Sequence, residues 1–319
     1  MNITAPIYTN ADKAREHLEA LRWPDGPFCP HCGSFKATRL PPQRGKVTKA
    51  QPEGSIRNGV VQCNDCREQY TVTVGTVFER SKVSLDKWLL CNHLLCSSKK
   101  GMSSHQLSRM LGVTYKTAWF MSHRLRAAMV QDDGQMGGPE GHVEADETYF
   151  GKDKSAPKSR TPIRNMNKIV SLVDRSTGRA KSFVVTERLT SETVAHILYT
   201  NVDRSSTLYT DEALHYVRPG RDFAAHYSVN HSQKEYVRYG APEITTNTIE
   251  GFFGIFKRGM KGIYQHCGQQ HLQRYMAEFD FRYTFRTACG FNDAERADQA
   301  LKGIYGKRLT YRRTCGAAA

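Results

Sequence analysis

The chain has 319 residues, and its 46 Lys and Arg against 31 Asp and Glu give a formal charge of +15. A mean hydropathy of -0.58, and the lack of any apolar run near the roughly 20 residues of a membrane span, exclude an integral membrane protein. The N-terminus lacks the layout of a signal peptide, so we expect a cytoplasmic protein. Its positive field favours a polyanion such as nucleic acid, and its length allows two or three domains.

Two Cys-x-x-Cys pairs, Cys29/Cys32 and Cys63/Cys66, dominate the N-terminal part of the chain. Each pair can offer two thiolates to one metal, and Zn²⁺ bound by four thiolates forms a closed structural site. In a reducing compartment, nine cysteines favour metal binding over disulfides. The spacing predicts a zinc ribbon over 27–78, after a helix and turn over 1–26, with Zn²⁺ as structural cofactor.

Residues 81–130 predict three helices. A capping box over 103–106 opens the second helix, and Gly112 and Thr114 form the turn before the third. A short helix, a glycine turn and a basic helix match the plan of a helix-turn-helix, although a plain helical hairpin is the alternative. The helix-turn-helix reading makes three side chains of the third helix candidate DNA contacts: Lys116, Arg124 and Arg126.

A Gly-rich linker over 131–141 precedes a change to strand patterns. Strands are predicted at 142–150, 167–174, 180–187, 206–211 and 226–232, and helices at 190–198, 246–258 and 269–286. Three hairpin-like strands, a helix, a strand and further helices predict an α/β domain with a mixed five-stranded sheet. This order is that of the ribonuclease H-like fold, over 142–290, and leaves 291–319 as a basic C-terminal tail.

Three acids end or open separate predicted elements: Asp146, Asp211 and Glu250. In a ribonuclease H-like sheet the first and fourth strands are neighbours, so Asp146 and Asp211 should meet, with Glu250 at the start of a following helix. Carboxylates suit Mg²⁺, and two such ions about 4 Å apart can activate a water or 3′-hydroxyl and stabilise the leaving oxygen.

Nearby acids compete for these roles. Glu144 shares a strand face with Asp146, whereas the two-residue period turns Glu147 to the other face. Glu212 competes with Asp211, which we prefer because it ends the apolar run.

Basic residues lie near the predicted acids. Lys152 and Lys154 belong to a loop over 152–164 that is either a phosphate-contacting flap or a solvated loop. Lys257 and Arg258 lie off the apolar stripe of the helix that carries Glu250. All four are candidate DNA contacts.

Six motifs together resemble the zinc-ribbon family of bacterial insertion-sequence transposases, of DDE type, with an ISXO2-like transposase domain. The motifs are at 23–33, 75–79, 143–149, 209–212, 231–237 and 246–259, and the resemblance runs from about residue 15 to 287. It implies a DNA transposase that binds double-stranded DNA at the terminal inverted repeats of its element, cleaves there to expose 3′-hydroxyls and joins these to target DNA. It further implies Mg²⁺ or Mn²⁺ as catalytic metal and at least a homodimer, because two ends must be held together.

By position, the resemblance assigns Asp146 and Asp211 as the first two catalytic acids and Glu250 as the third, with Lys257 as a DNA contact. The third position can be Asn in this family, so Asn247 competes with Glu250. Two alternatives have different activities: a DNA-binding regulator without catalysis, and a metal-dependent nuclease without strand transfer.

Overall fold

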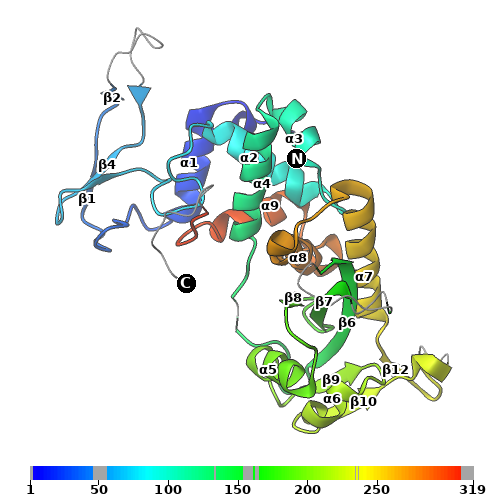
Figure 1. Ribbon diagram of the computed structural model, residues 1–319. Coiled ribbons are helices and arrows are strands. Elements are labelled where there is room, and N and C mark those ends of the chain that lie inside the picture. The colour runs from blue at the N-terminus through cyan, green and yellow to red at the C-terminus, as the bar shows by residue number, and fades with distance from the viewer. Residues whose placement is uncertain are drawn as a thin grey trace. The chain divides into compact units, whose positions relative to one another are not determined.

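The computed structural model describes residues 3–45, 56–132, 134–153, 161, 165–233, 235 and 237–309. The chain divides into two compact units (Figure 1). The first comprises Met1–Ser97, Ser104–Met129 and Asp293–Ala319, and the second comprises Ser98–Ser103 and Val130–Asn292. Among the helices of the described residues, none is both long and apolar enough to cross a bilayer.

The first unit opens with the short 3-10 helix η1 (Pro6–Tyr8) and helix α1 (Ala11–Arg22). Asn10 caps α1, because its side chain accepts hydrogen bonds from two amides of the first turn. The ribbon that follows is a three-stranded antiparallel sheet of order β1-β4-β5, with β2 and β3 paired beside it. Its strands are β1 (Ala37–Arg39), β2 (Gln43–Arg44), β3 (Ile56–Arg57), β4 (Val61–Cys63) and β5 (Gln69–Tyr70).

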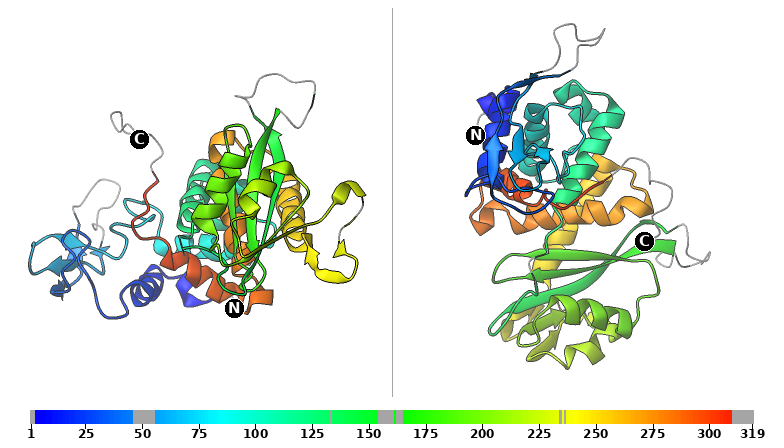
Figure 2. Two further views of the ribbon diagram at one scale, coloured as in Figure 1. Left: turned by 90° about the horizontal axis from the view of Figure 1, so that it is seen from below. Right: turned by 90° about the vertical axis from the view of Figure 1, so that its left-hand side faces the viewer.

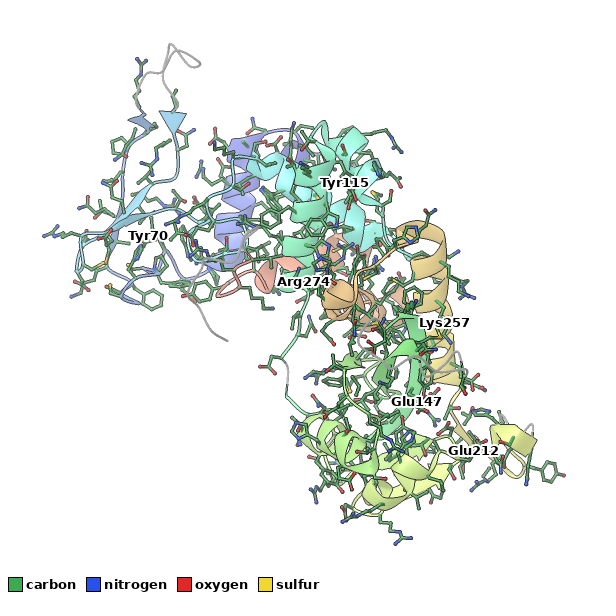
Figure 3. The ribbon with its side chains drawn as sticks, viewed as in Figure 1. Tyr70, Tyr115, Glu147, Glu212, Lys257 and Arg274 are labelled. Atoms are coloured by element: carbon green, nitrogen blue, oxygen red, sulfur yellow. The ribbon has the colours of Figure 1, made fainter. Side chains whose placement is uncertain are left out.

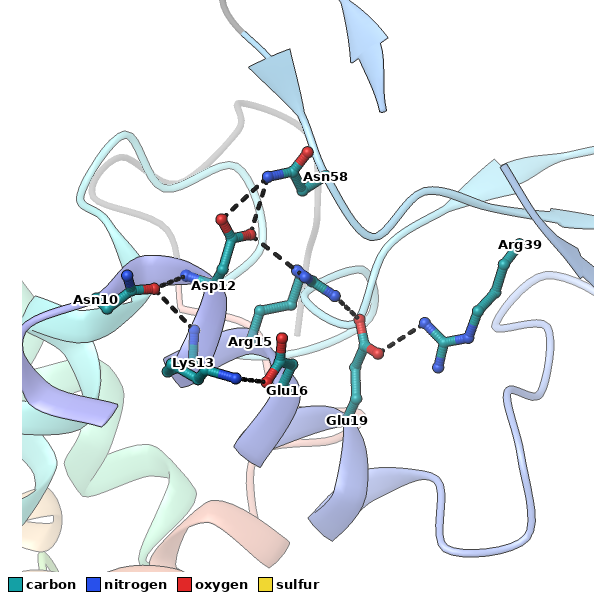
Figure 4. Close-up of polar contacts among 8 residues, drawn as sticks. All are labelled: Asn10, Asp12, Lys13, Arg15, Glu16, Glu19, Arg39 and Asn58. Carbon is teal, nitrogen blue, oxygen red and sulfur yellow. Dashed lines mark hydrogen bonds and ion pairs between the residues drawn. The ribbon is translucent and has the colours of Figure 1, made fainter. Parts of the chain in front are cut away.

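Polar side chains join α1 to the ribbon (Figure 4). Asp12 accepts a hydrogen bond from Asn58 at 2.9 Å, and Glu19 pairs with Arg39 at 2.7 Å. Arg15 pairs with both acids along the helix. The helix and the ribbon, predicted as separate segments, are thus held to each other.

Three helices follow the ribbon, as predicted: α2 (Leu85–Ser97), α3 (Ser104–Leu111) and α4 (Tyr115–Ala128). Gly112 takes a φ of +60° between α3 and α4, a conformation that glycine adopts without strain. Thr114 then caps α4 by accepting a hydrogen bond from the amide of Thr117.

The predicted C-terminal tail instead begins with a helix, α9 (Asp293–Lys302). Ala297, Ala300 and Leu301 form a buried face on it, and the side chain of Asn92 in α2 donates to the Ala297 carbonyl at 2.8 Å. The expectation of a tail is wrong for this stretch, because its small apolar residues recur at helical spacing and pack against α2.

The second unit contains a five-stranded sheet of order β10-β9-β6-β7-β8. The strands are β6 (His142–Lys152), β7 (Met166–Asp174), β8 (Ala180–Val185), β9 (Thr207–Thr210) and β10 (Ala225–Ser228). β6, β7 and β8 are antiparallel, whereas β9 is parallel to β6 and to β10. This topology is ribonuclease H-like, as predicted. The register of β6 shifts beside Gly151, whose φ is +65°.

Helices cover both faces of this sheet (Figure 2). Val143 and Ala145 of β6 pack with α5 (Ser191–Asn201) and α6 (Leu214–Gly220) in one core. Ile169 and Val173 of β7 pack with α7 (Asn247–Gly259) and α8 (Gln269–Thr284) in the other. Short elements complete the unit: η3 (His231–Gln233), β11 (Val237–Arg238), β12 (Ala241–Thr245), the π-helix η4 (Met260–Tyr264) and η5 (Thr287–Cys289). The sequence pattern did not indicate α6 or the β11–β12 hairpin.

Candidate functional site

The four predicted zinc ligands lie together in the ribbon. The sulfurs of Cys29 and Cys66 are 3.6 Å apart, as are those of Cys32 and Cys63, and all four lie within 4.8 Å of one another. A tetrahedral zinc with bonds of about 2.3 Å would hold its sulfurs about 3.8 Å apart. The cluster therefore fits Zn²⁺.

Backbone amides point at these sulfurs. The amide of Cys66 donates to Cys63 at 3.5 Å, and the amide of His31 donates to Cys29 at 3.4 Å. The Cys66 amide is the main cause that lowers the pKa of the Cys63 thiol to about 7. A thiolate is the form that binds metal, so these amides favour the ligand state at Cys63. Burial and the neighbouring thiols instead raise the pKa of Cys66 to about 12, so a metal ion would have to displace its proton.

Three carboxylates form a second cluster in the other unit. Oxygens of Asp146, Glu147 and Asp211 lie within 4.8 Å of one another. The parallel pairing of β6 and β9 explains the meeting, because its last pair is Glu144 with Tyr209. Two residues further along each strand, this register brings Asp146 opposite Asp211, which follows the end of β9. The predicted approach of these two aspartates is confirmed.

The electrostatics of this cluster favour a cation. Burial, together with the neighbouring carboxylates of Asp211, Glu147 and Glu250, raises the pKa of Asp146 to about 8. Burial also raises the pKa of Asp211, although the amide of Ala213 opposes this by donating to its carboxylate at 3.0 Å. Converging carboxylates repel one another unless a proton or a metal neutralises them. Hard oxygen donors of this kind fit Mg²⁺ or Mn²⁺.

Glu147 joins the cluster although its side chain starts from the opposite face of β6. Its carboxylate contacts His215 Nε2 at 3.1 Å and accepts a hydrogen bond from the buried Tyr216 hydroxyl at 3.1 Å, both on α6. The expectation that Glu147 points away is therefore wrong for its carboxylate. β9 ends at Thr210, so beyond that point β6 has no parallel neighbour and a long side chain can reach around its edge.

The predicted third acid, Glu250, lies beside this cluster. It is near enough to raise the pKa of Asp146, but its carboxylate accepts a hydrogen bond from Thr246 at 3.3 Å and lies 3.3 Å from His231 Nε2. The competing Asn247 is exposed, and its amide donates to the Thr245 hydroxyl at 3.1 Å. Of these two candidates, Glu250 is the one with an electrostatic effect on Asp146.

The predicted DNA contacts divide into exposed and buried groups. The exposed ones are Lys116, Lys152, Lys257 and Arg258, and Lys154 lies outside the described residues. Figure 3 shows Lys257 on α7.

Two predicted DNA contacts are buried instead. Arg126 is fully buried and donates to the Ser122 hydroxyl at 3.0 Å, and Arg124 donates to the carbonyl of Glu79 at 3.1 Å. The interpretation of these two as phosphate contacts is wrong for this conformation, because most of the α4 surface is packed within its unit. Helical spacing alone did not show how much of α4 would be buried.

Two protein-family models match the parts of the chain that contain the thiolate and carboxylate clusters. The ISXO2-like transposase domain matches residues 139–284, and the transposase zinc-ribbon domain matches residues 9–69. A protein of Halobacterium salinarum, described as an uncharacterized protein in transposable element ISH50, is 26% identical over 294 residues, covering 86% of this chain and 91% of that protein.

A structural match is to a chain in the cryo-EM structure of the simian T-cell lymphotropic virus intasome in complex with PP2A regulatory subunit B56 gamma. It has a TM-score of 0.29 and 17% identity, and it covers 55% of this chain and 63% of that one. With so low a TM-score, we draw no conclusion about fold or function from this match.

The two domain matches together span more than half of the chain. The zinc-ribbon match contains the thiolate cluster, and the ISXO2-like match contains the carboxylate cluster. The chain therefore belongs to the zinc-ribbon insertion-sequence transposases with an ISXO2-like DDE domain.

Proposed function

We propose that this protein is the active transposase of an insertion sequence. It binds the terminal inverted repeats, cleaves there to expose 3′-hydroxyls and joins these to target DNA. The observation that carries the proposal is the meeting of Asp146 and Asp211, with Glu147, at the open edge beyond β9. A domesticated regulator would have no need to keep three repelling carboxylates together.

In this proposal Asp146 and Asp211 hold the catalytic metal, and Glu250 completes the ligand set from α7. Bound Mg²⁺ or Mn²⁺ would supply an activated water or 3′-hydroxyl and charge stabilisation at the leaving oxygen. Glu147 is held by His215 and Tyr216, so its charge stays directed at the same site. Asp146 lies on β6 and Asp211 directly follows the neighbouring strand β9, so the sheet limits how far their separation can change.

The exposed cations supply the DNA contacts. Lys257 and Arg258 lie two turns along α7 from Glu250, and Lys152 is exposed at the end of β6. Phosphate neutralisation by such side chains makes binding fall steeply with salt. Lys116, near the start of α4, is the remaining described candidate for a contact from the helix-turn-helix.

An assay with labelled element ends, target DNA and Mg²⁺ separates the proposal from its rivals. A transposase gives joined products, a nuclease gives cleavage alone, and a regulator gives binding without either. At least two copies should assemble on paired ends, which light scattering of the protein–DNA complex would detect. Joined products would support the proposal, and bound but uncut ends would contradict it.

A further inference from the structure

Glu144 is a fully buried carboxylate on β6, two residues before Asp146, and it is not part of the carboxylate cluster. One of its oxygens accepts a hydrogen bond from the backbone amide of Ile249 at 2.8 Å. The other accepts from Arg175 Nε at 2.5 Å. Both oxygens are therefore occupied within the protein, which sets Glu144 apart from the acids that face the cluster.

The amide that Glu144 accepts from belongs to the first turn of α7. This helix follows Thr246, whose side chain makes no capping hydrogen bond to it, and Ile249 is its third residue. The amide at that position is one that a capping side chain ordinarily satisfies. Glu144 thus caps α7 from a neighbouring strand, and its negative charge is favourable at a helix N-terminus. Glu250 is the next residue.

Arg175 extends the same connection to other elements. Its guanidinium donates to the carbonyl of Glu243 at 2.6 Å and to that of Thr245, both on β12, which leads into α7. It also lies 4.1 Å from the ring centroid of Tyr209 on β9, two residues before Asp211. One ion pair, fully buried at Glu144 and half-buried at Arg175, therefore contacts β6, β9, β12 and α7.

We propose that Glu144 and Arg175 are positioning residues that fix the first turn of α7, and with it Glu250, relative to Asp146. This inference rests on the proposed function, in which Glu250 is the third metal ligand. A buried ion pair adds little net stability over apolar residues of the same volume. What this ion pair contributes is orientation. The planar guanidinium of Arg175 holds two carbonyls of β12, and the carboxylate of Glu144 holds one amide of α7.

A double-mutant cycle on Mn²⁺ affinity tests this, with zinc already bound to the ribbon and free Mn²⁺ measured by electron paramagnetic resonance. The variants are Glu144→Gln, Glu250→Gln and the double variant. Loss of an outer partner of a metal ligand weakens binding by about 10-fold or more. We expect such a loss for Glu144→Gln in the native background and less than about 2-fold in the Glu250→Gln background.

Two further variants keep the result interpretable. Arg175→Lys leaves the Glu144 carboxylate in place but replaces the planar fork by a point charge, so it should repeat the effect and can replace Glu144→Gln if that variant does not fold. Glu278→Gln is the matched control: Glu278 is an equally buried carboxylate, on α8, that pairs with Arg282. It should lower stability and leave Mn²⁺ affinity unchanged.

Three results would overturn the inference: no loss of affinity in Glu144→Gln and Arg175→Lys, an equal loss with and without Glu250, or no loss in Glu250→Gln itself. The titration does not require DNA cleavage. Failure of the wild-type protein to process element ends would therefore contradict the proposed function, whereas the Mn²⁺ titration could still be interpreted.

Discussion

The thiolate cluster of the ribbon and the carboxylate cluster of the second unit differ in whether the described residues supply a complete set of metal ligands. In the ribbon, four cysteine sulfurs from two knuckles surround one point, and backbone amides donate to those of Cys29 and Cys63. In the second unit, three carboxylates converge at the edge of a sheet, and burial together with their mutual repulsion raises the pKa of Asp146 to about 8. A closed set of ligands stabilises a fold, whereas an incomplete set leaves positions for a substrate.

The first prediction removes a ligand from the closed cluster. Cys63→Ser should unfold the ribbon, because the metal-binding free energy of such sites, about 10 kcal/mol or more, is also their folding free energy. Zinc content and heteronuclear NMR spectra would measure the loss.

Cys91→Ala is the control, since Cys91 is a buried cysteine of α2 outside the cluster. It should keep one zinc per chain. A folded ribbon in zinc-free Cys63→Ser would contradict the assignment of a structural metal.

The second prediction removes a ligand from the open cluster. Asp211→Asn should lower the cleavage rate of element ends by about 1,000-fold or more, since the amide neither carries charge nor binds Mg²⁺ well. Binding of the ends should stay within a few fold, because the exposed cations are unchanged. Gel-shift and single-turnover assays on the same preparation would measure both, and persistent cleavage would rule out the metal assignment.

The third prediction concerns the stability of the metal-free protein. The folded-state pKa of Asp146 is raised, so this group's contribution to stability is full below its ordinary pKa of 3.8 and is lost as pH rises toward about 8. Asp146→Asn removes that penalty and should stabilise the second unit at neutral pH by about 2–4 kcal/mol. Urea unfolding with the ribbon zinc present and no other divalent ion would measure it, and an equal effect of Asp146→Asn on the free energy of unfolding at pH 5 and pH 8 would contradict the raised pKa.

The fourth prediction concerns the pH dependence of metal binding at the open cluster. Below its pKa of about 8 the Asp146 carboxyl is protonated in the metal-free protein, so a binding metal must displace that proton. Mn²⁺ affinity should rise by up to about 10-fold per pH unit between pH 6 and 8 and level off above. Calorimetry in buffers of different ionisation enthalpy would count the released protons, and zero release at pH 7 would contradict the raised pKa.

Much of both clusters could be predicted from the sequence because their signals are local. Cys-x-x-Cys spacing fixes the thiolate geometry within a knuckle, and the alternation around Asp146 and the apolar run before Asp211 mark two strands. Strand order then follows from the succession of elements, since it is that of a known topology. These signals gave the sheet order and the meeting of the two aspartates.

The remaining features depend on packing between distant segments. The approach of Glu147 requires β9 to end at Thr210, and the burial of Arg126 depends on how much of α4 is covered. Glu144 and Asp146 share a strand face, yet one caps a helix and the other faces the cluster. Periodicity assigns a face to each side chain, but not the partner that it meets there.

Anomalous scattering at the manganese edge, from crystals with zinc in the ribbon and soaked in Mn²⁺, tests the central claim most directly. The account predicts a manganese peak within about 2.5 Å of oxygens of both Asp146 and Asp211, with zinc remaining on the four cysteines. The absence of manganese from these two aspartates at saturating concentration would contradict it.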